Sequence, residues 1–149
     1  MTLRWLLASF HLLALGIGLG AVIARGLALR SPLDRQGLRR VFLADAVWGV
    51  AAFLWMATGL WRLLGGVEKS TAYYLGNHVF LTKMALFLLV FGLEMRPMTT
   101  LIGWRGRVAR GEIPDATLAP ALARVSFWQA GLVTLMVFLA TAMARGSGA

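Results

Sequence analysis

Four long apolar segments, separated by polar stretches, constrain the fold of this 149-residue chain more than any other feature. A helix needs about 20 mostly apolar residues to cross the hydrocarbon core of a bilayer. The segments of roughly this length are Trp5–Ala24, Val41–Leu64, His78–Leu93 and Val125–Ala144. None of them alternates apolar and polar residues, as a strand of a membrane barrel does. The sequence therefore predicts an all-α, integral membrane four-helix bundle that forms a single domain over residues 1–149.

The composition and the flanks of the first segment support this interpretation. Hydrophobic residues make up 59% of the chain and its mean hydropathy is +0.74, whereas a soluble domain of this length carries more polar residues. A cleaved signal peptide carries its positive charge before the apolar segment. Here one arginine precedes Trp5–Ala24 and five follow it, so we expect this segment to remain as a spanning helix. Pro97 lies just past the third segment, and the polar stretch Thr99–Pro120 is predicted to be a loop with an amphipathic piece around Trp104.

The net charge of +9 would suggest a nucleic-acid partner in a soluble protein, but the distribution of the basic residues indicates a membrane topology instead. Ten of the 15 lie in or beside the connections that follow the first and third segments: Arg25, Arg30, Arg35, Arg39, Arg40, Arg96, Arg105, Arg107, Arg110 and Arg124. Four lie toward the opposite ends of the segments: Arg4, Arg62, Lys69 and Arg145. Cytoplasmic loops carry the excess of Lys and Arg. We therefore predict a multi-pass membrane protein with both termini outside and two basic loops in the cytoplasm, surrounded by the lipid bilayer and without a nucleic-acid partner.

Lys83 is an ammonium group inside the third apolar segment. An ionisable residue within a membrane is costly, and it is a functional-site hypothesis by default. His11 lies at a similar depth in the first segment, since both residues are roughly 9–10 Å from the outer ends of their helices at a rise of about 1.5 Å per residue. We expect the two side chains to share a ligand or a proton path. The alternative is a Lys83 that reaches the interface and a His11 that bonds to a backbone carbonyl or a hydroxyl.

Glycines give the first segment one face that a neighbouring helix can approach closely. Gly16 and Gly20 form a GxxxG pair with Gly18 between them, and this pattern favours close packing within the bundle over a contact between copies, which leaves a homo-oligomer as the alternative. His11 precedes Gly18 by seven residues, so it is expected on the same face, toward the interior. His78 precedes Lys83 by five residues, about 140° around a helix, and is expected at the membrane interface.

Three more charges are predicted at the inner ends of the first three helices, namely Arg25, Asp45 and Glu94. Buried charges in lipid pair with one another or line water. We favour an ion-pair network that fixes the helix packing. The alternative is a route for protons from the cytoplasm.

Several classes of site are excluded by residue types. The chain has no cysteine, which excludes thiolate metal ligands, disulfides and cysteine nucleophiles. It has two histidines, too few for a structural zinc site without cysteine. No phosphate-binding loop or nucleophile–base motif is present in the sequence.

Four stretches of the sequence resemble a bacterial family of four-helix membrane proteins known as a domain of unknown function. They read HLLALGIGLGAVIARGLALR, RRVFLADAVWGVAAFLWMATGLWR, EKSTAYYLGN and FLTKMALFLLVFGLEMRPM. This resemblance covers nearly the whole chain. It implies a location in the bacterial inner (cytoplasmic) membrane, with both termini in the periplasm, and it implies no activity.

A more distant resemblance is to the HemJ-type protoporphyrinogen oxidases, with the membrane domain of copper-resistance D proteins as a looser relative. The shared pattern has a histidine in the first helix, an arginine at that helix's inner end, a basic pair before a Trp-Gly in the second helix, and a lysine in the third. Here these positions are His11, Arg25, Arg39, Arg40, Trp48, Gly49 and Lys83. In that family the histidine and the lysine are the key residues, and haem b is associated with the protein.

The resemblance implies a redox-type membrane protein that binds haem b or a porphyrin between the first three spanning helices. His11 would ligate the haem iron, and Arg25 would belong to the cofactor site. Lys83 would be the catalytic residue, acting as a second ligand, a propionate partner or a proton donor. Haem chemistry depends on the axial ligand and on burial, while the protein binds and positions the cofactor. The alternative is a non-enzymatic transport component or assembly factor in which Lys83 and Asp45 are structural charges, so the sequence leaves open whether the protein is an enzyme.

Overall fold

The protein is all-helical in the computed structural model, which describes residues 2–65 and 71–146 and contains no strand within these ranges. Its helices are α1 (Thr2–Arg30), α2 (Arg35–Leu64), α3 (Thr71–Gly76), α4 (His78–Ala109) and α5 (Ala119–Ala144). The four long helices are apolar enough to cross a membrane. The all-α membrane fold class is therefore confirmed.

The helices extend beyond the apolar segments that predicted them, as α2 shows. Expected from Val41, this helix begins at Arg35, because the Asp34 side chain accepts a hydrogen bond from the backbone N–H of Gly37 at 2.8 Å and caps the helix. Position 37 requires glycine, because the Cβ atom of any other residue would collide with the carbonyl oxygen of Pro32. Apolar residues indicate which part of a helix lies in lipid. The capping residue determines where the helix itself begins, so a helix can be longer than its apolar segment.

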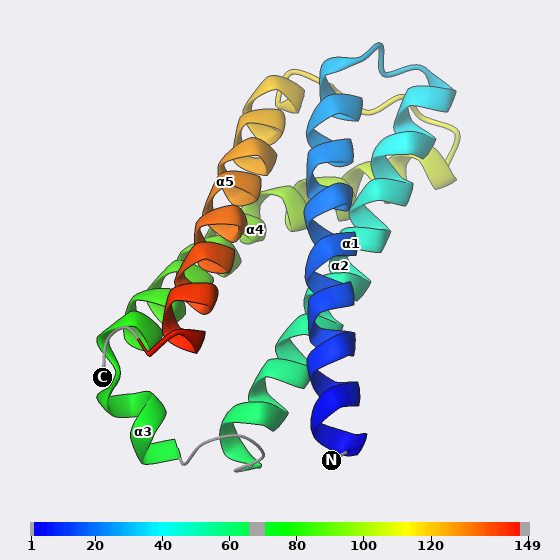
Figure 1. Ribbon diagram of the computed structural model, residues 1–149. Coiled ribbons are helices and arrows are strands. Elements are labelled where there is room, and N and C mark those ends of the chain that lie inside the picture. The colour runs from blue at the N-terminus through cyan, green and yellow to red at the C-terminus, as the bar shows by residue number, and fades with distance from the viewer. Residues whose placement is uncertain (1, 66–70, 147–149) are drawn as a thin grey trace.

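The prediction that the third spanning helix ends before Pro97 is wrong. α4 continues to Ala109, with Pro97 buried inside it, and its course changes direction along its length (Figure 1). Proline removes one backbone hydrogen bond and bends a helix without necessarily ending it when the surrounding packing is favourable. At about 1.5 Å per residue α4 is roughly 48 Å long, more than the hydrocarbon core of about 30 Å. Much of the predicted loop at Thr99–Pro120 is therefore helical.

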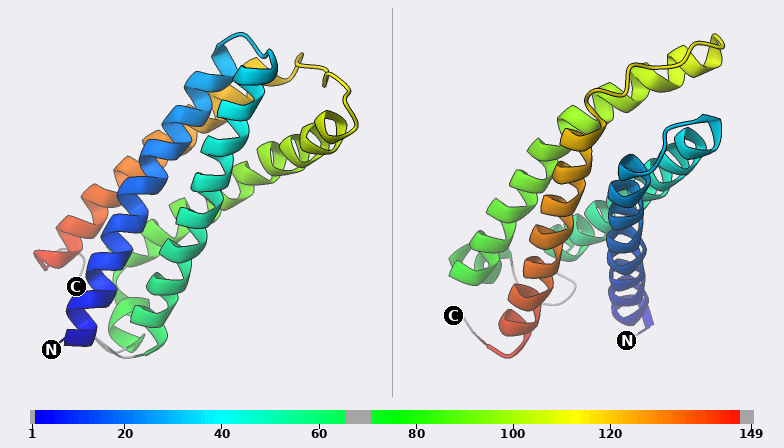
Figure 2. Two further views of the ribbon diagram at one scale, coloured as in Figure 1. Left: turned by 90° about the vertical axis from the view of Figure 1, so that its right-hand side faces the viewer. Right: turned by 90° about the horizontal axis from the view of Figure 1, so that it is seen from above.

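The long helices form two pairs that meet along α1 and α5. α1 packs along α2 and α5, and α5 packs along α4, as the two views in Figure 2 show. α2 and α4 have no extensive backbone contact with each other in the described part of the chain. The connections that follow α1 and α4, with arginines in or beside them, lie at one end of the bundle (Figure 1). The beginning of α1, the end of α5 and α3 lie at the other end.

The interior of the bundle follows a spacing of seven residues, which is two turns of a helix. On α1 this spacing brings His11, Gly18 and Arg25 to the buried face. On α2 it relates Trp48 to Trp55, which are both buried. His11 therefore lies toward the interior, as predicted from its relation to Gly18.

The glycines of α1 divide between two faces. A Cβ atom on Gly18 would lie 3.4 Å from Trp48 and from Ala51, so this glycine lets α1 and α2 pack closely. Gly16 and Gly20 are exposed and have no neighbouring atom within 4 Å of such a Cβ position. The expected packing within the bundle is correct for Gly18 and wrong for the GxxxG pair, because residues two positions apart point to opposite sides of a helix.

Candidate functional site

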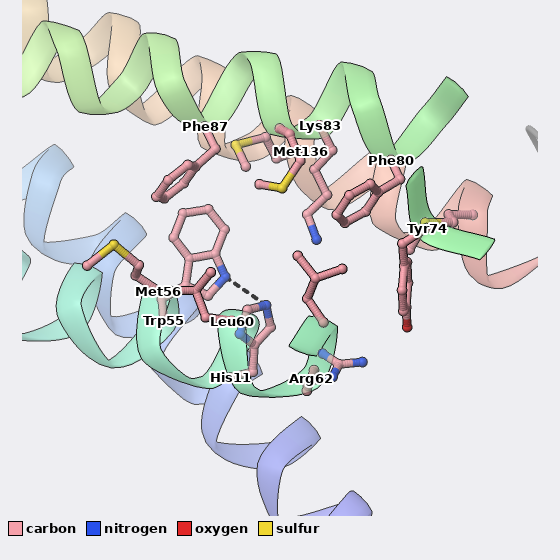
Figure 3. Close-up of a pocket in the computed structure, with 14 residues that line it drawn as sticks. His11, Trp55, Met56, Leu60, Arg62, Tyr74, Phe80, Lys83, Phe87 and Met136 are labelled. Carbon is pink, nitrogen blue, oxygen red and sulfur yellow. Dashed lines mark hydrogen bonds between the residues drawn. The ribbon is translucent and has the colours of Figure 1, made fainter. Parts of the chain in front are cut away.

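A chamber lies among the long helices at the end of the bundle that carries the termini. It consists of two adjoining cavities of about 310 and 330 Å³, and Figure 3 shows the side chains that line the first of them. The residues that line both cavities are His11, Trp55, Arg62, Tyr74, Lys83, Met136 and Met143. The structure thus brings together His11 and Lys83, the two residues predicted to meet because of their equal depth.

His11 is held by hydrogen bonds at both ring nitrogens. Trp55 Nε1 donates to His11 Nε2 at 2.9 Å, and His11 Nδ1 lies 2.9 Å from Thr58 Oγ1. The Thr58 hydroxyl itself lies 2.7 Å from the carbonyl oxygen of Leu54, to which it donates. An indole N–H can only donate, so Nε2 is the acceptor and Nδ1 carries the hydrogen of a neutral ring. A Cβ atom on Gly59 would lie 3.2 Å from His11 Cε1, so the missing side chain makes room for the imidazole.

Lys83 extends from α4 into the chamber, toward the side on which His11 and Leu60 lie (Figure 3). Its side chain is half-buried. Arg62 of α2 lines the same chamber, so two cationic side chains from different helices face one space. The chamber therefore has two cationic side chains in a largely apolar wall.

Aromatic rings and thioethers make most of the wall of the first cavity. The ring centroids of Trp55 and Phe87 lie 5.8 Å apart at an interplanar angle of 68°, and those of Tyr74 and Phe80 lie 5.2 Å apart. The methionines that line it come from three helices: Met56, Met84, Met136 and Met143. Aromatic faces and flexible thioethers adapt to apolar ligands of varied outline.

His78 and Arg25 lie away from the chamber. His78 is exposed at the start of α4 and does not line either cavity. Arg25 is 14 residues beyond His11 on α1, about 21 Å along the helix axis. Of the residues expected to bind a cofactor, the structure brings His11 and Lys83 together and places Arg25 elsewhere.

Arg25 forms the centre of an ionic network that joins all four long helices. Its side chain is fully buried, and its Nη1 and Nη2 atoms donate to the two carboxylate oxygens of Glu94 at 2.8 Å each. Nη1 also donates to Asp45 Oδ1 at 2.8 Å. The remaining donors reach α5, where Nη2 bonds to Gln129 Oε1 at 2.8 Å and Nε to Ser126 Oγ at 3.1 Å.

Three residues that the sequence did not single out complete this network. Trp48 Nε1 donates to Glu94 Oε2 at 3.0 Å, and Gln129 Nε2 donates to the same oxygen at 2.8 Å. Arg105 Nη2 donates to Asp45 Oδ2 at 2.8 Å and to the Phe42 carbonyl at 2.9 Å. Two cations thus face two carboxylates, and no buried polar side-chain atom in the described ranges lacks a partner. The expected ion-pair network is confirmed, and it includes Arg105, which the sequence analysis counted only among the basic residues beside the connections.

The network does not lie at the inner ends of the helices, where it was expected. Beyond it lies a cluster of apolar side chains that includes Leu29, Leu38 and Leu101. On its other side lies an apolar layer made of Ala21, Val22, Trp48, Val90, Ala130 and Val133. The correction follows from the helix ends, because α1, α2, α4 and α5 all continue past the apolar segments.

The apolar layer separates the network from the chamber. On α1, α4 and α5 its residues fall between those of the two polar sites, as Val90 does between Phe87 and Glu94 on α4. On α2, Trp48 belongs to the layer through its ring and to the network through its N–H. The described residues also contain no group of three or more His, Asp or Glu side chains that could hold a metal ion. The network and the chamber are therefore two distinct sites.

Asp45→Asn tests the structural account of the network. We expect this change to lower the free energy of unfolding by about 1–3 kcal/mol, because it removes a charge that Arg25 and Arg105 both contact. Thermal unfolding in detergent measures the loss. Asp34→Asn is the matched control, since asparagine caps a helix as well as aspartate. A variant that melts like the parent but has lost ligand binding would contradict the structural role.

Comparisons with known proteins identify the family. No curated protein and no solved structure matches the chain. The family model described as "Predicted membrane protein (DUF2214)" matches residues 3–148. That match covers almost all of the chain and agrees with the four apolar helices. The chain therefore belongs to the DUF2214 family of predicted membrane proteins.

Proposed function

We propose that this protein binds a tetrapyrrole, a porphyrin in its metal-free form, in the chamber among α1, α2, α4 and α5. The observation that carries the proposal is the meeting of His11 and Lys83 in one apolar chamber. These two residues are also the key positions of the distant HemJ-type pattern. The proposal concerns binding, and it assigns no reaction to the protein.

The size and the lining of the chamber support a flat, apolar ligand. Each of the two adjoining cavities is at the lower end of the range of about 300–1,000 Å³ that is typical of small-molecule sites. Trp55, Phe80 and Phe87 supply aromatic rings, which interact favourably with another flat conjugated ring. A flat, apolar ligand that moved from the lipid into the chamber would keep an apolar environment and gain specific contacts with these rings.

The cations of the chamber support acidic substituents on that ligand. Natural porphyrins carry carboxylate side chains, and an ammonium or guanidinium group forms strong hydrogen bonds with a carboxylate. Lys83 and Arg62 provide these two groups from α4 and α2. In this account Lys83 is a propionate partner, which is one of the three roles that the resemblance implied.

The iron of haem b fits this arrangement less well than the macrocycle does. Haem, when bound, would supply redox chemistry at iron, and an imidazole nitrogen would be the expected protein ligand. In the structure His11 Nε2 already accepts the Trp55 hydrogen bond at 2.9 Å. The imidazole nitrogen is therefore already occupied by a hydrogen bond, and for this reason the proposal names the metal-free ligand.

Titration of the purified protein with protoporphyrin IX tests the proposal. In lipid nanodiscs we expect saturable binding, seen as a change in porphyrin fluorescence. Lys83→Ala should weaken it about tenfold, because a hydrogen bond to a charged group contributes about 1.5–3 kcal/mol. His11→Ala should also weaken it, since Trp55 would lose the partner that orients its ring.

His78→Ala is the control, because His78 is exposed and lies outside the chamber. It should leave the affinity unchanged. A parent protein that is purified without a tetrapyrrole, and that binds neither protoporphyrin IX nor haem b above the level of empty nanodiscs, would exclude the proposed function.

A further inference from the structure

The hydrogen bond between Trp55 and His11 determines what the imidazole can do for a ligand. Trp55 is 7% exposed, and it packs in one buried cluster with Ala14 and Met136. Its ring also contacts Phe87 edge-on. Turning the indole away from His11 would disrupt this packing. The packing of the ring therefore stabilises the hydrogen bond between Trp55 and His11.

The tautomer of His11 is fixed from both sides of the ring. Trp55 requires an acceptor at Nε2, because an indole N–H cannot accept. Thr58 requires a donor at Nδ1, because its own hydrogen is directed to a backbone carbonyl. Both neighbours therefore select the ring with hydrogen on Nδ1, and the single lone pair of that ring points at the Trp55 hydrogen.

An iron ligand needs that same lone pair. A neutral imidazole binds iron through its unprotonated nitrogen. The chain has two histidines and no cysteine, and His78 does not line the chamber. His11 is thus the imidazole that would have to bind haem iron, and Trp55 competes for the nitrogen involved.

We infer that Trp55 determines specificity in the chamber, by occupying the ring nitrogen of His11 that would otherwise ligate iron, so that the chamber favours a metal-free porphyrin over haem. This inference rests on the proposed function. It assigns ligand selectivity to the indole N–H of Trp55, whereas packing in the aromatic wall needs only the ring.

The variant Trp55→Phe tests the inference, because phenylalanine keeps an aromatic ring and removes the N–H. We expect the affinity for haem b, relative to that for protoporphyrin IX, to rise about tenfold, the factor that corresponds to one hydrogen bond of ordinary strength. The bound haem should show the Soret band of an imidazole-ligated iron. The double variant Trp55→Phe/His11→Ala should lose both the gain and that band.

Trp48→Phe is the matched control. It removes an indole of the same helix whose N–H donates to Glu94 instead of to His11, so the ratio of the two affinities should not change. A ratio that is the same in the parent and in Trp55→Phe, with porphyrin binding intact, would overturn the inference and leave the proposed function standing. A parent protein whose haem is ligated by His11 would overturn it as well.

Nitrogen NMR of the parent protein, labelled at histidine with ¹⁵N, provides a measurement that needs no variant. We expect His11 to show a protonated Nδ1 and an unprotonated, hydrogen-bonded Nε2. A hydrogen on Nε2 would contradict the inference directly, even if Trp55→Phe does not fold. If neither tetrapyrrole binds to any variant, the proposed function fails, whereas the NMR result still shows whether Trp55 holds the lone pair.

Discussion

Replacing Arg25 with methionine is expected to lower the free energy of unfolding by about 3–5 kcal/mol, the usual cost of removing one partner from a buried ionic group. Arg25 is fully buried and pairs with the carboxylates of Asp45 and Glu94 at 2.8 Å each. After the change Asp45 would still have Arg105, which lies 2.8 Å away. Glu94 would lose the cation that bonds to both of its oxygens, and it would remain as a half-buried charge.

The double variant Arg25→Met/Glu94→Gln makes this prediction specific. It leaves Asp45 and Arg105 as a neutral pair and removes the charge that the single variant exposes to a low-dielectric interior. We therefore expect the double variant to be more stable than Arg25→Met alone, by about 1–3 kcal/mol. Unfolding in mixed detergent measures both. If Glu94→Gln lowers the free energy of unfolding of Arg25→Met further, the network does not stabilise the protein through charge balance.

A reporter that is active only in the periplasm should work when it is fused after Ala149 and should be silent when it is inserted near Arg107. The expected difference is all-or-none, because the basic loops remain in the cytoplasm. Two of the ten arginines assigned to the cytoplasmic side, Arg25 and Arg105, belong to the ionic network. The other eight still outnumber Arg4, Arg62 and Arg145 at the opposite end, with Lys69 outside the described residues. Activity at the basic loop and silence at the C-terminus would reverse the orientation.

Apolar segment length and residue type were sufficient to predict the fold class, because lipid accepts only structures that satisfy their own backbone hydrogen bonds. Helix ends could not be predicted in the same way. α4 continues through Pro97 to Ala109, outside the stretch that apolarity marks. The position of the ionic network was misjudged for the same reason, since an end of an apolar segment was taken as an end of a helix.

The meeting of His11 and Lys83 was predictable because depth along a helix can be counted in residues. The partners of His11 were not, since Trp55 and Thr58 lie 44 and 47 residues away in sequence and reach it only for one rotation of each helix. One signal in the sequence pointed to them. Trp55, Thr58 and Gly59 occupy positions three and four apart on α2, which places an indole, a hydroxyl and a residue without a side chain on one face.

The apolar layer between the chamber and the ionic network has an electrical consequence. A membrane potential acts mainly across the least polarisable part of its path, and moving one elementary charge through 100 mV changes the free energy by about 2.3 kcal/mol. The chamber lies entirely on one side of this layer, together with Lys83. Under the proposed function, a charged ligand that arrives from the nearer membrane surface would reach the chamber without crossing this layer, so the part of the membrane potential that falls across the layer would not act on its binding.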